Sequence, residues 1–343
     1  MNNVVLDSFT LILYSLTFLI GSVGNMFVLR VLFRQRKAAE HRSMSITNIY
    51  LTNLALSDLL SSITIPLQFL FCSYYLLENF LLGPYICVLL KAIQILTYNI
   101  SILTMVVIAI DRYRLIHNPL QSYNKRLNPK YALLIVWLLA ILFSLTCLVS
   151  MKVSEYFQSS DHLIGCRVLF PKVLPISSTL LRQIRATVLV VGFYFIPLLI
   201  IIPLYVLSIR TIYQRPKISQ FNHSQYAESK HRSITLLIFI PLAFSLCWLP
   251  IHIMNMYDFY SPKEISMLNR SKIRSCNAST VYTIFYWLAI TSCCYNPFIY
   301  SWLNKTFRNS LPKCCVHSEQ KEQRPRNISN ASFTSSIFYL SST

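Results

Sequence analysis

The sequence has few charged residues and very few glycines. Asp, Glu, Lys and Arg make up only 13% of its 343 residues, roughly half their usual share in a soluble domain. Five glycines exclude a collagen-like chain and argue against a Gly-rich phosphate-binding protein. The ten cysteines do not form a dense disulfide scaffold, because several lie within apolar runs. Since hydrophobic residues make up 54%, the composition indicates an integral membrane protein.

Seven nearly charge-free runs are each long enough to cross a bilayer, which requires about 20 mostly apolar residues per helix. The first run lacks the preceding basic residues and the cleavage site of a secretory signal, so we expect it to remain in the protein as a helix. The fold class is therefore all-α integral membrane, a bundle of seven transmembrane helices. The runs lie near residues 8–29, 46–74, 92–110, 131–151, 186–207, 234–257 and 281–303.

Acidic residues are scarce, and the net charge is +19. Such an excess can indicate nucleic-acid binding. However, 21 of the 31 Lys and Arg residues follow the first, third, fifth and seventh runs. Because basic residues gather in cytoplasmic loops, this bias predicts an N-terminus outside and a C-terminus inside the cell, with no role for nucleic acid.

The chain divides into four expected segments. Residues 1–8 are a short extracellular N-terminus, and 9–303 hold the seven transmembrane helices. Residues 304–315 form an amphipathic helix, and 316–343 form a polar, Ser- and Asn-rich tail whose composition predicts disorder.

Each run carries residues that an inert membrane helix would avoid. In chain order these are Gly24-Asn25, Asn53, Asp58, Asp111-Arg112-Tyr113, Trp137, Pro197, Tyr205, Phe244, Cys247-Trp248, Pro250, Asn296-Pro297 and Tyr300. The ordered set resembles the class A (rhodopsin-like) G-protein-coupled receptors, over about residues 9–315. The resemblance implies a receptor that binds an extracellular ligand and activates a heterotrimeric G protein. It also implies that residues 304–315 form the receptor's short helix 8.

The resemblance assigns switching roles at the inner half of the bundle. Arg112 pairs with Asp111 at rest and contacts the G protein when active, although an arginine here could also be an interface anchor. Pro250 would be a hinge rather than a static kink. Many receptors of this family hold this arginine with an acidic residue at the foot of the sixth helix. Lys230 occupies that position here, which predicts some ligand-independent activity. The other switch residues are Tyr113, Ile102, Pro197, Tyr205, Phe244, Asn296, Pro297 and Tyr300.

Asp58 is an ionisable residue in the middle of the second run, and such a residue is a functional candidate by default. In one interpretation its carboxyl group is neutral and hydrogen-bonded to Asn25 and Asn296. In the other, implied by the resemblance, it binds an allosteric sodium ion together with Ser101 and Asn296. No other cofactor is expected.

Covalent features follow from the same resemblance and from the expected topology. Cys87 and Cys166 match the family's paired disulfide between the third helix and the second outer loop. Cys314 and Cys315 are candidates for palmitoylation beside the membrane. Asn269 and Asn277 are glycosylation motifs on the outer side.

The outer half of the bundle is the expected ligand cavity. Helical spacing turns Gln94 and Tyr98 inward. Amine receptors of this family have an aspartate at the position of Gln94, whereas a glutamine there resembles neuropeptide receptors, notably the neuropeptide Y group. The seventh run has no lysine that could bind retinal, which argues against a light receptor of this family. The second outer loop is expected to form a hairpin that receives peptides. The other ligand-binding candidates are Gln68, Trp248, His252, Asn255, Asp258 and Tyr286.

The partners expected from these features are an extracellular small peptide, a heterotrimeric G protein and membrane lipids. A lipid or another non-amine small molecule is the alternative ligand for the same fold. A transporter using Asp58 is a further alternative, but no internal repeat supports it. An enzyme is not expected, because no metal-ligand cluster, nucleophile–base pair or phosphate loop is visible in the sequence.

Overall fold

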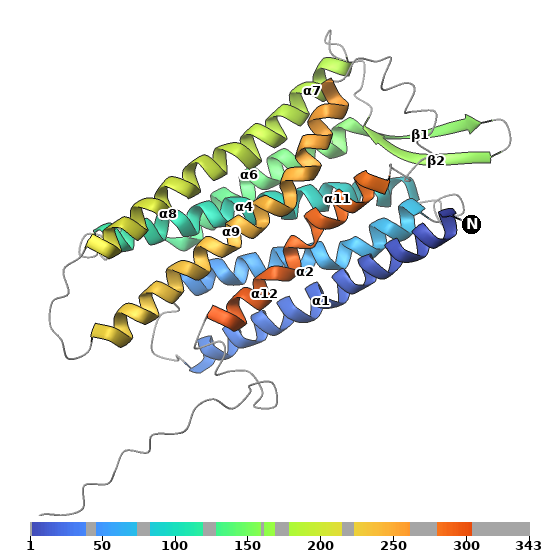
Figure 1. Ribbon diagram of the computed structural model, residues 1–343. Helices are drawn as coiled ribbons and strands as arrows, with labels where there is room; N and C mark the ends of the chain where they lie inside the picture. The colour runs from blue at the N-terminus through green and yellow to red at the C-terminus, as the bar shows by residue number, and fades with distance from the viewer. Residues whose placement is uncertain are drawn as a thin grey trace, which may run out of the picture. The chain divides into compact units, whose positions relative to one another are not determined.

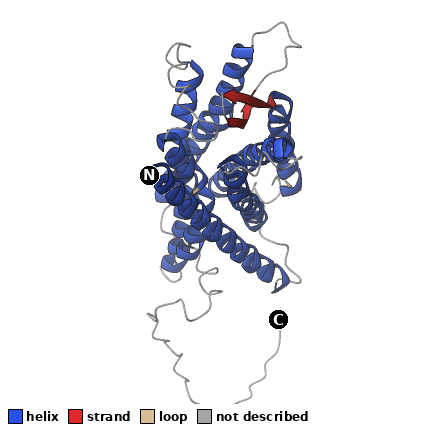
Figure 2. Cartoon of the chain, turned by 90° about the vertical axis from the view of Figure 1, so that its right-hand side faces the viewer, coloured by secondary structure: helices blue, strands red, loops and turns tan. Residues whose placement is uncertain are grey.

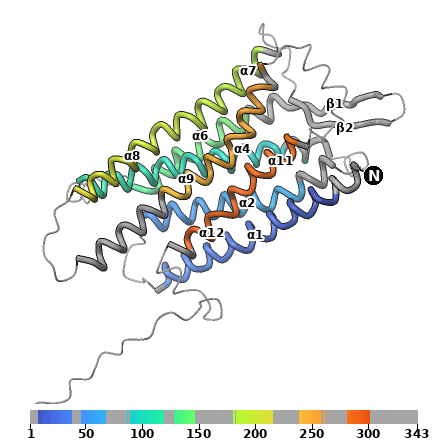
Figure 3. Tube along the Cα trace, in the orientation of Figure 1, coloured from blue at the N-terminus to red at the C-terminus, as the bar shows by residue number. Residues whose placement is uncertain are grey.

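The structure is a computed structural model that describes residues 2–38, 46–73, 83–118, 128–158, 161–168, 178–214, 223–260 and 280–303. All of these residues belong to one compact unit, Met1–Asn309 (Figure 3). The predicted amphipathic helix 304–315, the tail 316–343 and the cysteines within them lie outside the described residues, as do Asn269 and Asn277.

Helices account for all seven expected runs (Figure 1). The first four are single helices, the fifth joins three helical segments, the sixth is one long helix and the seventh has two parts. Their bounds are α1 Asn2–Ala38, α2 Ile46–Ser73, α4 Gly83–His117, α6 Pro129–Ser150, α7 Ser178–Thr187, the π-helical η1 Val188–Phe195, α8 Ile196–Gln214, α9 His223–Tyr260, α11 Thr280–Ile290 and α12 Ser292–Leu303.

Most helices extend beyond the apolar runs that predicted them. The 37 residues of α1 correspond to about 55 Å of helix, whereas the hydrocarbon core is about 30 Å thick. Hydropathy detects only the part inside the core, so it misses the ends. The expected boundary at residue 8 is therefore wrong: α1 begins at Asn2, within the segment 1–8 that was expected to precede the first helix.

Four described helices are long and apolar enough to span a membrane by themselves. They are Ser8–Lys37, Leu89–His117, Gln183–Gln214 and Ile238–Tyr257, and Pro129–Leu145 is a shorter apolar helix. Their large side chains point outward: Leu199 is 70% exposed and Leu142 is 67% exposed. In water such exposure would be unfavourable, whereas lipid tails solvate these side chains.

A hairpin connects the fourth and fifth spans (Figure 2). Strand β1, Met151–Gln158, pairs antiparallel with β2, Asp161–Val168, and the hairpin contacts α4. The expected hairpin in the second outer loop is thus confirmed. Cys166 lies in β2 opposite Val153 and Cys87 lies in α4, but the side chains of both cysteines are outside the described part, so their pairing stays a prediction.

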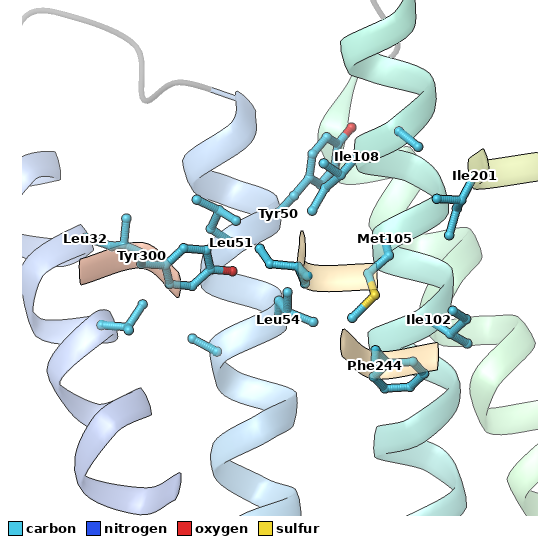
Figure 4. Packing of buried hydrophobic residues seen from close by; sticks show 14 of the residues in the cluster. Leu32, Tyr50, Leu51, Leu54, Ile102, Met105, Ile108, Ile201, Phe244 and Tyr300 are labelled. Atoms are coloured by element: carbon cyan, nitrogen blue, oxygen red, sulfur yellow. The ribbon is translucent and has the colours of Figure 1, made fainter. Parts of the chain in front are cut away.

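Buried side chains from most of the spans meet in one core (Figure 4). Leu54 from α2, Met105 from α4 and Phe244 from α9 belong to this cluster. Tyr205 from α8 and Tyr300 from α12 are buried in the same cluster. The core therefore connects helices to which the sequence assigns the switch residues.

Prolines inside the helices leave backbone carbonyls without their usual donor, four residues earlier. The carbonyl freed by Pro297 belongs to Cys293, and Asn25 Nδ2 donates to it at 2.9 Å. Asn25 Nδ2 also donates to the Gly21 carbonyl at 2.9 Å. The expected hydrogen bond between Asn25 and Asp58 is therefore wrong, because both amide hydrogens are directed to carbonyls and Oδ1 of Asn25 has no hydrogen-bond partner among the described residues.

Glycines allow the first span to approach the second and seventh closely. A Cβ atom on Gly24 would lie 2.8 Å from Cγ of Pro297, and one on Gly21 would meet the Ser62 hydroxyl. The proline ring cannot rotate away, so Gly24 is the more restrictive position. By contrast, a Cβ on Gly192 would meet only Val188, at an ordinary 3.9 Å.

We expect Gly24→Ala to destabilise the protein by about 1–3 kcal/mol, because overpacking outweighs the helix propensity gained. Thermal unfolding in detergent measures this effect. Gly192→Ala is the matched control and should leave the midpoint unchanged or raise it slightly. Equal midpoints for the two variants would contradict the close packing of α1 against α12.

Candidate functional site

Tyr98 and His252 form the centre of a polar cluster buried in the outer half of the bundle. The Tyr98 hydroxyl donates to the Phe193 carbonyl at 2.9 Å and lies 3.0 Å from His252 Nε2. Phe193 is four residues before Pro197, so Tyr98 supplies the donor that this proline lacks. Since the phenol has one hydrogen, Nε2 of His252 is protonated and donates to the Tyr98 oxygen.

Trp248 forms the aromatic floor of this cluster. Its ring lies 4.3 Å from the Tyr98 ring and 5.8 Å from the Phe244 ring, measured between centroids. Its Nε1 donates to Ser292 Oγ at 3.0 Å, which connects α9 to α12. The sequence motifs included Trp248 and Phe244 but gave no indication of Ser292.

Tyr194 is a second tyrosine in the cluster, which sequence reasoning missed. Its ring lies 4.8 Å from the His252 ring, and its hydroxyl donates to the Ser245 carbonyl at 2.9 Å. It thereby holds the π-helical segment η1 against α9. The only signal for Tyr194 in the sequence is a residue with a hydroxyl group inside the mostly apolar fifth run.

Gln94 lies one turn outward from Tyr98 on α4 and is only 5% exposed. Neither amide atom of its side chain has a hydrogen-bond partner within the described structure. A buried amide in this state loses about 1–3 kcal/mol of solvation free energy. A ligand or water that offers both a donor and an acceptor would recover this loss.

The other predicted ligand-binding residues lie on α2, α9 and α11. Tyr286 on α11 stacks on Tyr282 with centroids 6.3 Å apart. Asn255 on α9 is partly exposed. Gln68 and Asp258 lie in α2 and α9, but their side chains fall outside the described part of the chain.

Asp58 lies deeper in the bundle and is 5% exposed. Asn296 Nδ2 donates to its Oδ2 at 2.5 Å, and the Ser101 hydroxyl donates to its Oδ1 at 3.4 Å. Ser57 Oγ lies 2.8 Å from Ser101 Oγ and adds a second hydroxyl that the sequence did not single out. Carboxylate and hydroxyl oxygens are the donors that hard cations prefer, so these residues fit a sodium ion.

The Asp111-Arg112-Tyr113 motif lies at the inner end of α4, where all three side chains are partly exposed. The Tyr113 ring stacks on His117 at 5.2 Å, and His117 Nδ1 lies 3.4 Å from Thr211 Oγ1 of α8. The inner end of the third span thus contacts the fifth span.

The residues expected to relay movement lie between the ligand cluster and this inner end. Ile102 and Phe244 belong to the buried core together with Tyr205 and Tyr300 (Figure 4). Pro197 is buried at the start of α8, Pro250 is inside α9 and Pro297 is inside α12. The buried core therefore includes Tyr98 of the ligand cluster together with Tyr205 and Tyr300.

Comparison with known proteins gives a family match across most of the chain. The family model described as "7 transmembrane receptor (rhodopsin family)" matches residues 24–300. Mouse neuropeptide Y receptor type 6 is 29% identical over 321 residues, covering 90% of this chain and 80% of the relative. The rabbit type 6 receptor is 30% identical, covering 88% and 78%. The Drosophila melanogaster tachykinin-like peptides receptor 86C is 28% identical, covering 89% and 59%.

Proposed function

Because this chain belongs to the rhodopsin family of seven-transmembrane receptors, which act through heterotrimeric G proteins, we propose that its activating ligand is a small extracellular peptide. As a member of this family it is a multi-pass membrane protein and a G-protein-coupled receptor, and it is not an enzyme. The proposal draws support from its similarity to receptors named for neuropeptide Y and for tachykinin-like peptides.

The observation that carries the peptide proposal is the buried Gln94 amide. Both its donor and its acceptor lack a partner within the described structure, and a peptide carboxamide or backbone amide offers one of each. An ammonium ligand offers only donors and would need an acidic partner, but this position has none. The aromatic floor of Tyr98 and Trp248 favours an apolar or aromatic group beneath the amide.

The ligand acts by stabilising one of two packings of the helices over the other. Contact with Trp248 changes its packing on Tyr98 and Phe244, and thereby the bend of α9 at Pro250. Outward movement of the inner end of α9 then exposes Arg112 to the G protein. Tyr205 and Tyr300 would stabilise this open arrangement by turning toward each other.

Sodium would oppose this change from the site at Asp58. Asp58, Ser101 and Asn296 would hold the ion, and the ion would supply a positive charge that stabilises the buried carboxylate. The same residues without sodium hold the second and seventh spans together through the hydrogen bond from Asn296 to Asp58.

The remaining features of the proposal concern the two membrane faces. The N-terminus is extracellular and the C-terminus cytoplasmic, in the plasma membrane. A disulfide between Cys87 and Cys166 would tie the β1–β2 hairpin to α4. Sugars on Asn269 and Asn277 would lie outside, and palmitoyl groups on Cys314 and Cys315 would hold the amphipathic helix 304–315 to the inner surface.

The experiment is a second-messenger screen in cells that express the chain, against amidated peptides, amines and lipids. We expect a peptide to activate it, and Gln94→Leu to reduce the potency of that peptide about tenfold, because an amide of the ligand is then buried without a partner. Gln214→Leu makes the same change at an exposed position at the end of α8 and should have no effect. Activation by a lipid alone would contradict the peptide proposal.

A further inference from the structure

Lys91 is a charged residue at the start of the third span, one position before the apolar run 92–110. It is the only charged residue of α4 between Gly83 and Ile110. Its side chain is partly buried. The sequence alone accounts for Lys91 only as one of the few basic residues on the predicted outer side.

The Lys91 ammonium lies over an aromatic ring of another span. Its Nζ is 5.5 Å from the centroid of the Tyr286 ring on α11, within the range of about 6 Å for a cation–π interaction. Tyr286 in turn stacks nearly parallel on Tyr282, at an interplanar angle of 7°. The contact therefore joins the third span to the seventh.

Lys91 also shares a helix face with the residues of the proposed ligand cavity. Lys91, Gln94 and Tyr98 are spaced three and four residues apart, which places them in one column along α4. At 1.5 Å per residue, the Cα atom of Lys91 lies about 4.5 Å outward from that of Gln94 and about 10 Å outward from that of Tyr98. A ligand in contact with Gln94 would therefore extend past the ammonium on its way out.

We propose that Lys91, held over Tyr286, is a subsite for a carboxylate of the activating peptide. The inference rests on the proposed function, namely that the ligand is a peptide whose amide meets Gln94. The carboxylate is either an Asp or Glu side chain close to the amide on Gln94, or the free C-terminus itself. Lys91 thereby makes the receptor select acidic peptides over neutral and basic ones.

The test is a library of hexapeptides in matched pairs, applied to cells expressing the wild type and Lys91 variants, with G-protein activation as the readout. One arm compares C-terminal acids with C-terminal amides, and the other compares Asp, Asn and Lys at each of the last three positions. We expect the wild type to prefer the carboxylate about 10- to 100-fold, the range for a charge-assisted hydrogen bond. The arm that shows the preference identifies the source of the carboxylate.

The variants separate charge from structure. Lys91→Arg should keep the preference, Lys91→Gln should abolish it, and Lys91→Glu should reverse it toward lysine-containing peptides. Tyr286→Phe keeps a ring face and should keep the charge preference, whereas Tyr286→Leu should weaken it. Lys37→Glu, on the exposed inner end of α1, makes the same change in net charge and should have no effect. Surface expression is measured for every variant.

Two results would overturn the inference in distinguishable ways. If peptides activate Lys91→Glu with the same charge preference as the wild type, Lys91 does not bind the carboxylate, while the peptide proposal stands. If no peptide activates the wild type at any concentration, the peptide proposal and the subsite both fail.

Discussion

Replacing Arg112 with alanine should reduce agonist-stimulated nucleotide exchange at least about 30-fold, the effect of removing one partner of a desolvated charge pair at an interface. Arg112 is at the inner end of α4 and partly exposed. Its guanidinium can donate five hydrogen bonds in a fixed geometry. The buried core that includes Tyr205 and Tyr300 lies between it and the ligand cluster. An alanine leaves this core intact but removes the group that contacts the G protein in the proposed mechanism.

The measurement is GTP exchange on purified G protein with receptor in lipid, at equal receptor density. Arg114→Ala is the matched control, because Arg114 has the same charge, lies two residues later on the same helix and is exposed. It should retain most of the exchange. Agonist-independent exchange, which Lys230 in place of an acidic lock predicts, should also disappear in Arg112→Ala. Exchange retained in that variant, with normal ligand binding, would contradict the assigned role.

Replacing Asp58 with asparagine should abolish the effect of sodium on agonist affinity. In the wild type, sodium is expected to lower agonist affinity about fivefold or more, the lower range of allosteric coupling. The variant keeps the size of the side chain and can still accept a hydrogen bond from Asn296, which donates to Asp58 in the structure. It lacks only the negative charge that a cation requires. Radioligand competition with and without sodium measures the difference.

Potassium at the same ionic strength is the control for general salt effects. The wild type should respond to sodium but not to potassium, and Asp58→Asn should respond to neither. Identical responses of the wild type to both salts would rule out a sodium site. Asp58 would then be a packing residue that holds α2 to α12 through Asn296.

The number and order of the spans could be predicted from the sequence, because each helix that crosses a bilayer needs about 20 mostly apolar residues. Runs of apolar residues located all seven. Helix ends were missed because residues outside the hydrocarbon core carry no hydropathy signal, as at α1, which continues to Ala38. The π-helical segment η1 within the fifth span was missed because nothing in its composition distinguishes it from an α-helix.

The site residues were only partly predictable, for a physical reason. Helical spacing placed Gln94 and Tyr98 on one inward face, and both are 5% exposed. Partners on other helices could not be derived, since Phe193, Ser292 and Tyr194 are brought in by tertiary packing. A proline does give one usable signal: it leaves a carbonyl four residues earlier in need of a donor. Tyr98 supplies that donor to Phe193.

The expected partner of Asn25 shows where this reasoning failed. Two polar residues at similar depth suggested a hydrogen bond between Asn25 and Asp58. Pro297 deprives the Cys293 carbonyl of its usual donor. The Asn25 amide donates to that carbonyl instead. Satisfying every buried backbone group takes precedence in lipid, because no water is available to replace the missing partner.

The most direct test of the whole account is the distance between the inner ends of α4 and α9. Spin labels at positions 118 and 230, in a background without other reactive cysteines, report this distance by pulsed electron resonance in lipid. The account predicts a shift to longer distances when the activating peptide and G protein are both present, and no such shift in their absence. A single unchanged distance distribution under both conditions would contradict the two packings on which the signalling mechanism depends.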